Sequence, residues 1–332
     1  MKAAIITAPR QIKIATVEDP VPNPEEVVVA VDACGICGTD VHILEGHYGS
    51  GYPLIPGHEF AGHVVAVGTE VKRLSVGMRV AVDPSLYCNQ CRYCRHGRNN
   101  LCDELRGMGV DVTGAAAEYI AVPAINAIVL PEHIQTRDAS LIEPLSCAVH
   151  AFDLLKPALG ARILIYGTGP MGLIMLQLLN THGFASIDVV EPRPNRLKIA
   201  ANLGCSGHAA SASELERQDD WDIIIDASGS INAIQDGMAR IAKGGTFLQL
   251  GVTEPTATIT LEPYRIYRDE IRILGSMAIL NSYARATDLL AAGAIDPNLL
   301  ISHRLVLDQY AAAVSLCSRG GGLKVQVCPS GL

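Results

Sequence analysis

The chain has 332 residues, which at about 150 residues per domain predicts two domains. Hydrophobic residues make up 49% and charged residues 18%, a balance that favours a large core and excludes a disordered chain. The formal net charge of −8 argues against nucleic acid or an anionic membrane as the main partner. No apolar run reaches the ~18 residues that cross a bilayer, and the start does not resemble a signal peptide. We therefore expect a cytoplasmic protein whose ten cysteines are not paired in disulfides.

The first third of the chain is rich in short β-branched runs. They fall at 26–32, 61–68, 79–82 and 117–122, and Gly, Pro or Asn residues bound them. Such runs are typical of strands. Strands this short and this closely spaced predict a partly closed β barrel or sandwich.

From residue 162 onward, strand and helix patterns alternate. A continuous apolar strand is typical of a parallel sheet that is buried on both faces. Strand–helix alternation predicts an α/β fold with a doubly wound sheet. The expected strands are 162–166, 186–190, 221–226, 245–250, 271–274 and 324–328, and the expected helices are 171–179, 193–202, 231–241, 283–292 and 307–318.

A G-x-G-x-x-G motif stands between the first strand and the first helix of this region. It reads Gly167-Thr-Gly169-Pro170-Met171-Gly172. The first glycine permits a tight turn, the second lets a pyrophosphate approach the backbone, and the third lets the helix pack against the sheet. Alone the pattern is weak, but a strand before it and a helix after it predict a dinucleotide site.

An acidic residue, Glu191, ends the next strand. A carboxylate there accepts hydrogen bonds from the ribose hydroxyls and repels a 2′-phosphate, so NAD is favoured over NADP. The neighbouring Arg193 and Arg196 weaken that preference. The alternative is a glycine turn of a flavodoxin-like protein that binds no dinucleotide.

Four cysteines with metal-ligand spacing lie within one short segment, at Cys88, Cys91, Cys94 and Cys102. Four thiolates form a closed tetrahedral zinc site with no position for substrate. The polar segment between them has little to pack, so the metal would supply its folding energy. Buried or redox cysteines, or a zinc ribbon for nucleic acid, are the alternatives.

Further zinc-ligand types occur at Cys37, His58, Glu59 and Glu143. A catalytic zinc keeps three protein ligands and one open position. These residues are too far apart in sequence for their spacing to join them. Each one alone is equally consistent with an ordinary structural role: a core thiol for Cys37, a hydrogen-bonded histidine for His58, and a solvated carboxylate for Glu59 or Glu143.

Several motifs together resemble the zinc-dependent medium-chain dehydrogenases. They are CGICGTDVH at 34–42, GHEFAGHVVAVG at 57–68, the four-cysteine segment and GTGPMG at 167–172. The sequence EPLS at 143–146 is most similar to the polyol, sorbitol-type, members. The resemblance implies a discontinuous GroES-like catalytic domain at 1–146 and 276–332, and a Rossmann NAD-binding domain at 147–275.

The resemblance also implies a catalytic zinc. Cys37 and His58 would be direct ligands, Glu59 or Glu143 would complete the site, and Asp40 would hydrogen-bond to His58. The four-cysteine segment would hold a second, structural zinc. The implied reaction is hydride transfer between a polyol or secondary alcohol and NAD.

The remaining roles follow from the same resemblance. Thr39 and His42 would relay the alcohol proton. The residues that would contact NAD are Gly167, Gly169, Pro170, Met171 and Gly172 at the pyrophosphate, Glu191 and Arg196 at the adenosine, and Leu250, Val252, Ser276 and Met277 near the nicotinamide.

Two departures from the sorbitol-type pattern bear on the substrate. Sorbitol-type enzymes tend to carry an arginine and an aromatic soon after the position of Gly275, where this chain has SMAIL at 276–280. They also tend to carry an aromatic at the position of Ile43, and the resemblance implies that side chains at all these positions face the hydroxyls of a polyol. We therefore expect another polyol or a less polar secondary alcohol, with Tyr48, His47 and Arg106 as candidate lining residues. A threonine-type or simple secondary-alcohol dehydrogenase is the first alternative. A non-catalytic nucleotide sensor or lens-type protein is the second. The resemblance also implies a homodimer or homotetramer, and we expect 271–274 to be a sheet edge available for pairing.

Overall fold

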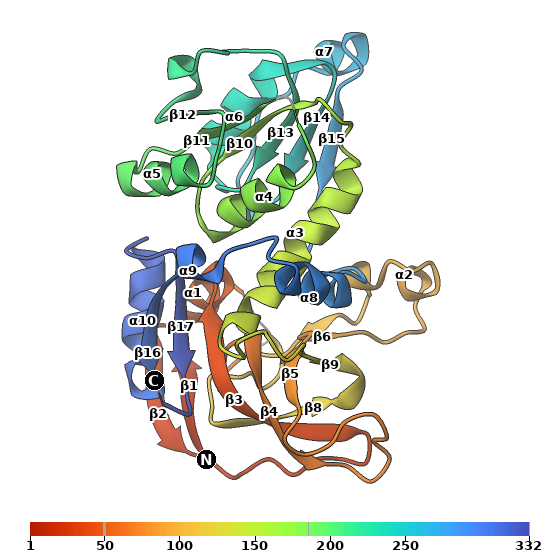
Figure 1. Ribbon diagram of the computed structural model, residues 1–332, viewed down its shortest axis with the longest axis vertical. Helices are drawn as coiled ribbons and strands as arrows, with labels where there is room; N and C mark the ends of the chain where they lie inside the picture. Colours follow the sequence, from red (N-terminus) through yellow and green to blue (C-terminus); the bar gives the residue numbers. More distant parts are fainter. Residues whose placement is uncertain (49–50, 185, 332) are drawn as a thin grey trace. The chain divides into compact units, whose positions relative to one another are not determined.

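The computed structural model describes residues 1–48, 51–184 and 186–331, and the chain divides into two compact units (Figure 1). Unit 1 contains Met1–Ser146 and Ile279–Leu332, so both ends of the chain build it. Unit 2 is Cys147–Ala278, which ends slightly later than the sequence suggested. Within the described ranges, no helix is long and apolar enough to cross a bilayer.

Unit 1 is organised around one long strand, β3 (Glu26–Ile36). β4 (Glu59–Val67) pairs antiparallel with one side of it. On the other side, β8 (Tyr119–Pro123) pairs with its first half and β17 (Lys324–Cys328) with its last residues. Over the described residues this gives a seven-stranded sheet in the order β16-β17-β3-β4-β5-β9, with β8 beside β3. The last strand of the chain therefore lies beside one of the first.

The other elements of unit 1 surround this sheet. A hairpin, β1 with β2, was not expected from the sequence, nor was α1, which follows β3 directly. The bounds are β1 Lys2–Ala8, β2 Gln11–Thr16, β5 Arg79–Val82, β6 Ser85–Leu86, β7 Arg106–Gly107, β9 Ala127–Val129 and β16 Ile301–Val306, with α1 Gly38–Glu45, α2 Arg92–Arg95, α8 Tyr283–Ala291, α9 Pro297–Leu300 and α10 Tyr310–Ser318. Helix α3 (Ile142–Leu155) begins in unit 1 and continues into unit 2.

Unit 2 is a six-stranded parallel sheet over the residues described, in the order β12-β11-β10-β13-β14-β15. This is the 3-2-1-4-5-6 order of a doubly wound dinucleotide fold, and it confirms the predicted fold class. The bounds are β10 Arg162–Tyr166, β11 Ser186–Val190, β12 Gly207–Ala209, β13 Trp221–Asp226, β14 Ile241–Gln249 and β15 Arg272–Gly275, with α4 Pro170–Asn180, α5 Pro194–Asn202, α6 Ile231–Arg240 and α7 Pro263–Arg268.

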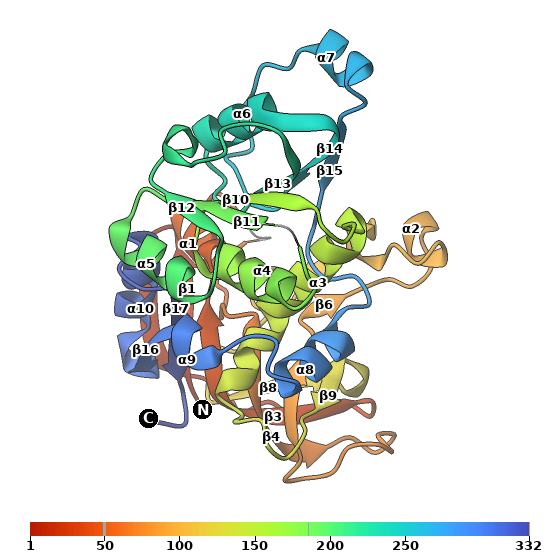
Figure 2. The same cartoon turned by 45° about the horizontal axis from the view of Figure 1, so that its top comes forward.

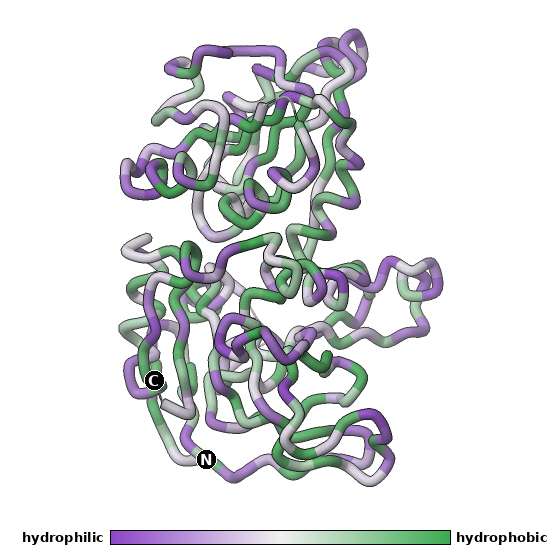
Figure 3. Tube along the Cα trace, viewed as in Figure 1, coloured by the Kyte–Doolittle hydropathy of each residue, from purple (hydrophilic) through white to green (hydrophobic). Residues whose placement is uncertain are grey.

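Hydropathy explains the layering of unit 2. The central strands are apolar and buried, whereas α5 and α7 are largely hydrophilic (Figure 3). Helix α4 is the apolar exception and packs against β10 and β11 (Figure 2). In such a sheet, ligands bind beyond the carboxyl ends of the strands, where the strand order reverses between β10 and β13.

Candidate functional site

The ends of two neighbouring strands bring Cys37, His58 and Glu59 together. Cys37 directly follows β3, and His58 directly precedes β4. Because β3 and β4 are antiparallel, the end of one meets the start of the other, and Gly35 lies opposite Glu59. The ligand atoms of Cys37, His58 and Glu59 all lie within 4.8 Å of one another. The thiol is half-buried and the other two side chains are buried.

Gly35 makes room for the Glu59 carboxylate. A Cβ at position 35 would lie 2.1 Å from Glu59 Oε2, closer than any real contact. Only glycine at this position leaves the carboxylate where it is. Gly35, two residues before the expected ligand Cys37, is therefore required because any larger residue would displace the Glu59 carboxylate.

A buried lysine that sequence reasoning missed completes the charge pattern. Lys324 begins β17, which pairs with the end of β3. Its Nζ donates to both oxygens of Glu59 at 2.6 Å and to the carbonyl of Ile36 at 3.4 Å. Burial opposes its charge, but the Glu59 carboxylate raises the pKa of Lys324 above its usual range. The one available signal was a lysine at the start of an otherwise apolar strand.

Asp40 links helix α1 to His58. One oxygen, Oδ2, accepts a 2.8 Å hydrogen bond from the backbone N–H of Cys37 at the start of α1. The other, Oδ1, lies 3.9 Å from His58 Nδ1. Burial disfavours the imidazolium, but Asp40 and the hydrogen-bonded thiol of Cys37 raise the pKa of His58 well above its usual range. The same negative potential favours a bound cation.

The donor set fits zinc. Neither His58 Nδ1 nor Asp40 Oδ1 has a hydrogen-bond partner among the described residues, although both are buried. With Nδ1 facing Asp40, Nε2 is the ring nitrogen left for a metal ion. A histidine whose second ring nitrogen faces a carboxylate is the usual arrangement of a zinc ligand. Cysteine, histidine and glutamate are the types that catalytic zinc prefers.

Glu143, Thr39 and His42 lie around this set. Glu143, in the first turn of α3, is half-buried and adds to the negative potential at His58, although it lies outside the set of three. Thr39 Oγ1 is 3.7 Å from Cys37 Sγ. His42 follows one turn later on α1 and is half-buried.

The four-cysteine segment forms a second cluster, built around α2. The Sγ atoms of Cys88, Cys91, Cys94 and Cys102 lie within 4.8 Å of one another, and all ten cysteines of the chain are free. Backbone N–H groups donate to three of the sulfurs. The backbone N–H groups of Cys94 and Asp103 lower the pKa of the Cys91 thiol to about 6. Burial and the thiols of Cys102 and Cys91 raise the pKa of the Cys94 thiol to about 12. Four converging sulfurs fit a tetrahedral zinc ion.

The glycine motif of unit 2 has the geometry its spacing predicts. Gly167 has φ +90°, and a Cβ on Gly172 would lie 1.9 Å from the Gly167 carbonyl oxygen. Pro170 is in the first turn of α4, with Gly169 as N-cap, and Met171 follows it. A Cβ on Gly169 would meet only Arg196 Nη1, at 3.6 Å. The N–H groups at this helix start are thus free of a side-chain cap.

Glu191 is buried at the end of β11 and binds the glycine turn. Its Oε2 accepts from the N–H and hydroxyl of Thr168, at 3.0 and 3.3 Å, and its Oε1 accepts from the N–H of Arg193 at 3.0 Å. The carboxylate therefore holds the turn in addition to any contact with a ribose. Its two oxygens retain lone pairs for that contact.

A second residue missed from the sequence, Asp226, organises the loops after β13 and β14. It is fully buried and accepts from Ser228, Gly229 and the side chain of Gln249. An acidic residue at the end of an apolar strand was the available signal. The expected nicotinamide-side residues follow β14 and β15: Leu250 donates its N–H to the backbone carbonyl of Asp226, Val252 is 77% exposed, Ser276 has a buried hydroxyl and Met277 is half-exposed.

Ile43 does not line the site. It is 1% exposed and packs in a separate core cluster with Ile6 and Leu54. The expectation that an aromatic at this position would face a polyol is therefore wrong for this chain, because the position points into the core. Tyr48 and Arg106 are exposed.

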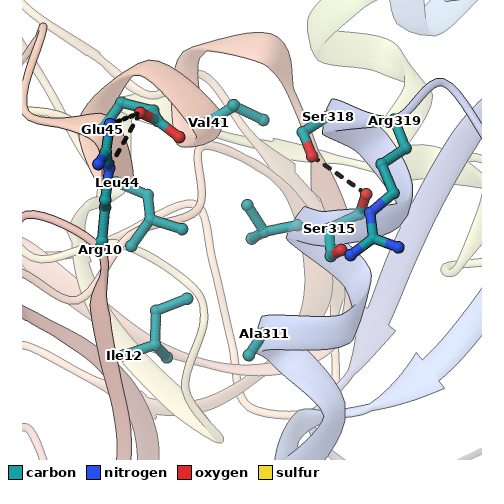
Figure 4. Close-up of a pocket in the computed structure, with 10 residues that line it drawn as sticks. Arg10, Ile12, Val41, Leu44, Glu45, Ala311, Ser315, Ser318 and Arg319 are labelled. Carbon is teal, nitrogen blue, oxygen red and sulfur yellow. Dashed lines mark hydrogen bonds and ion pairs between the residues drawn. The ribbon is translucent and has the colours of Figure 1, made fainter.

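A hollow of about 400 Å³ opens between α1 and α10 (Figure 4). Its apolar lining includes Val41 and Leu44 from α1 and Val314 from α10. It contains none of the expected site residues.

Comparisons with known proteins agree with this geometry. Residues 23–132 match the alcohol dehydrogenase GroES-like domain, and residues 170–292 match the zinc-binding dehydrogenase family. The chain is 31% identical to D-arabinitol dehydrogenase 1 of Uromyces fabae, over 99% of this chain and 97% of that one. It is 34% identical to D-altritol 5-dehydrogenase of Agrobacterium fabrum, over 86% and 87%. It is 30% identical to L-threonine 3-dehydrogenase of Saccharopolyspora erythraea, over 96% of each.

Two solved structures share the whole fold. A zinc-binding dehydrogenase of Sinorhizobium meliloti bound to NADP superposes with a TM-score of 0.95 at 32% identity, over 99% of each chain. The short chain alcohol dehydrogenase (rspB) of Escherichia coli CFT073, complexed with NADH, superposes with a TM-score of 0.93 at 31% identity, also over 99% of each. The chain therefore belongs to the zinc-binding dehydrogenases, and it is a zinc- and nicotinamide-dependent oxidoreductase.

Proposed function

We propose that the buried cluster at the ends of β3 and β4 is the catalytic zinc site of a polyol or secondary-alcohol dehydrogenase. The observation that carries the proposal is the convergence of Cys37, His58 and Glu59 within 4.8 Å beside a carboxylate, Asp40, that faces the histidine. We assign Cys37 and His58 as ligands, with Glu59 as the third. Glu143 is then a nearby carboxylate that strengthens the field at the site.

Lys324 is compatible with ligation by Glu59. A carboxylate has about four lone-pair positions, so two hydrogen bonds from one ammonium leave others for a metal. The ammonium also balances the charge of a buried carboxylate, which is costly to bury unpaired. Glu59→Gln should therefore remove more zinc than Glu143→Gln.

Zinc bound there supplies a Lewis acid that lowers the pKa of an alcohol hydroxyl. The surrounding residues of unit 1 orient the substrate and carry its proton away. Thr39, whose Oγ1 lies 3.7 Å from Cys37 Sγ, would pass the proton toward His42, which lies one turn along α1 and would act as the general base. The glycine turn of unit 2 would hold NAD, which would supply the hydride acceptor.

For the cofactor we propose NAD rather than NADP. Glu191 ends β11 and lies at the glycine turn, so a 2′-phosphate there would meet a buried carboxylate. Arg196 is close enough to the turn to contact a pyrophosphate or adenosine. The four-cysteine cluster is proposed to hold a structural zinc, because its four sulfurs leave no open position.

The substrate class follows from the relatives and from the structure. Two of the relatives described above are named for the polyols arabinitol and altritol. With Ile43 in the core, one of the two sequence arguments against a sorbitol-like substrate falls away. A threonine-type dehydrogenase is the second candidate, favoured by the relative of that name.

A substrate panel tests the proposal. Sugar alcohols, short diols, secondary alcohols and threonine would be oxidised with NAD and with NADP while NADH absorbance is followed, before and after chelation. We expect polyol turnover with NAD that chelation removes and zinc restores. Reaction with threonine alone would overturn the polyol assignment, and full activity after verified removal of all zinc would overturn the metal assignment.

We also propose that the protein is a homodimer or homotetramer. β15 is the edge strand of the unit 2 sheet, and Ile273 on it is 45% exposed. An unpaired edge with an apolar side chain is available to a second copy. Light scattering would measure the molar mass of the assembly, and we expect Ile273→Lys to lower this mass toward that of a monomer. If the mass is unchanged in Ile273→Lys, the edge at β15 is not the interface.

A further inference from the structure

A buried tyrosine lies behind the Asp40–His58 pair. Tyr310 is the first residue of α10 and is fully buried. With Ala313 and Val314, it forms the apolar face of that helix. These three residues belong to the main core cluster of unit 1, and α10 contacts both β17 and α1, the helix that carries Asp40. Packing thus fixes the ring, and the buried hydroxyl is the part of the side chain that needs a hydrogen-bond partner.

The hydroxyl of Tyr310 faces the Asp40 carboxylate. It has no hydrogen-bond partner within ordinary distance among the described residues, and neither has Asp40 Oδ1 or His58 Nδ1. Asp40 is thus a neighbour of both other groups, since its Oδ1 lies 3.9 Å from His58 Nδ1 and its carboxylate interacts with the Tyr310 hydroxyl. Buried polar groups in native proteins are hydrogen-bonded almost without exception, so three neighbours of this kind indicate one shared network.

The alternatives for this hydroxyl are poor. Among the described residues, two other titratable groups that interact with it are the thiols of Cys34 and Cys317. Burial raises the pKa of both, so both remain thiols, which accept hydrogen bonds weakly. Asp40 is the strong acceptor, and its Oδ2 is already fixed by the Cys37 N–H. Oδ1 is left to serve Tyr310 and His58 together.

Resting on the proposed zinc site, we propose that Tyr310 is a positioning residue: its hydroxyl donates to Asp40 and thereby holds His58 in its zinc-binding orientation. The hydroxyl touches neither the metal ligands nor the substrate. Its effect on the metal passes through the carboxylate, as an outer partner that orients a ligating histidine.

The test compares the release of two zinc ions from one molecule. Zinc-loaded wild type and Tyr310→Phe would be mixed with a chromogenic chelator, and the release rate of each zinc measured. We expect the zinc of the Cys37 site to leave roughly tenfold faster in Tyr310→Phe. The zinc of the four-cysteine cluster should leave at the wild-type rate, because it has no contact with this network.

Two controls separate positioning from packing. Tyr52→Phe removes another hydroxyl that binds α1, through the carbonyl of Ile43, and should leave both rates unchanged. In an Asp40→Asn background, Tyr310→Phe should add no further effect, because the two residues act in series. An equal effect in both backgrounds, or equal acceleration of both zinc ions, would overturn the proposal.

The outcome also distinguishes this inference from the assignment of the site. If wild type holds only the four-cysteine zinc, the proposed catalytic site fails. If wild type holds both and Tyr310→Phe releases both at wild-type rates, only the role of Tyr310 fails. Should Tyr310→Phe not fold, 3-fluorotyrosine at position 310 keeps the ring and strengthens the donor. Release must then be slower, and unchanged or faster release contradicts the proposal.

Discussion

The two candidate metal clusters of unit 1 are built in opposite ways. The four-cysteine cluster comes from one short segment, is partly exposed and consists only of thiols. The Cys37 cluster comes from the ends of three strands, is largely buried and combines a thiol, an imidazole and a carboxylate with Lys324. The four-cysteine cluster needs only the correct spacing of its cysteines. The Cys37 cluster also needs the fold to balance the charges of its buried side chains. This balance is a general requirement for a buried metal site that keeps an open coordination position.

The largest effect should follow from breaking the buried cluster. Cys37→Ser should lower turnover by about 1,000-fold or more, since a lost Lewis acid costs several kcal/mol and each 1.36 kcal/mol is tenfold. NAD binding, measured by fluorescence titration, should persist because unit 2 is unchanged. Near-wild-type turnover would show that this cluster is not catalytic.

The charge balance can be broken separately. Lys324→Met leaves the Glu59 carboxylate buried without its partner, which should cost about 3–5 kcal/mol of unfolding free energy in denaturant titration. The matched control is Lys2→Met, whose pair with Asp308 is exposed and should be worth at most about 1 kcal/mol. Similar losses in the two variants would argue against a special role for the buried pair.

The local cluster should fail locally. Cys94→Ser should lower the zinc content by one ion per chain and open the segment around α2 to proteolysis, because metal holds that polar segment. Turnover should fall far less than in Cys37→Ser. A loss of both zinc ions would mean that the two clusters depend on one another.

The smallest effect concerns an exposed pair in unit 2. Arg162 lowers the pKa of Asp222 below its usual 3.8 through hydrogen bonds at 2.8 and 2.9 Å. Because the pKa of Asp222 is lower in the folded chain than in the unfolded chain, its charged form stabilises the fold at pH values above the unfolded pKa. This stabilisation is lost as the pH falls through the lower, folded-state pKa. Asp222→Asn should thus cost about 0.2–1 kcal/mol near neutral pH, discounted for exposure. The difference from wild type should vanish in urea titrations below pH 3, and a pH-independent difference would reject the pair.

The sequence predicted the fold class well because its signals are local. An apolar strand, a glycine turn and a helix follow one another within 162–180, so periodicity suffices. Lys324 and Tyr310 were not foreseen, because their partners Glu59 and Asp40 are hundreds of positions away. The burial of Ile43 was not foreseen either, since α1 was not predicted and has no clear amphipathic pattern to orient it. The spacing of residues in the sequence is enough to predict a site that one segment forms. A site formed by residues on paired strands can be recognised only when the register of that pairing is known.

The place of Lys324 in the chain has a consequence for biosynthesis. The four cysteines at 88–102 emerge from a ribosome close together, and could capture zinc while most of the chain is still unmade. Glu59 must wait for β17, because Lys324 is made 265 positions later in the chain, before its counter-charge arrives. The structural ion can therefore be loaded before β17 has been made, whereas the charge balance of the reactive centre is complete only once β17 pairs with β3.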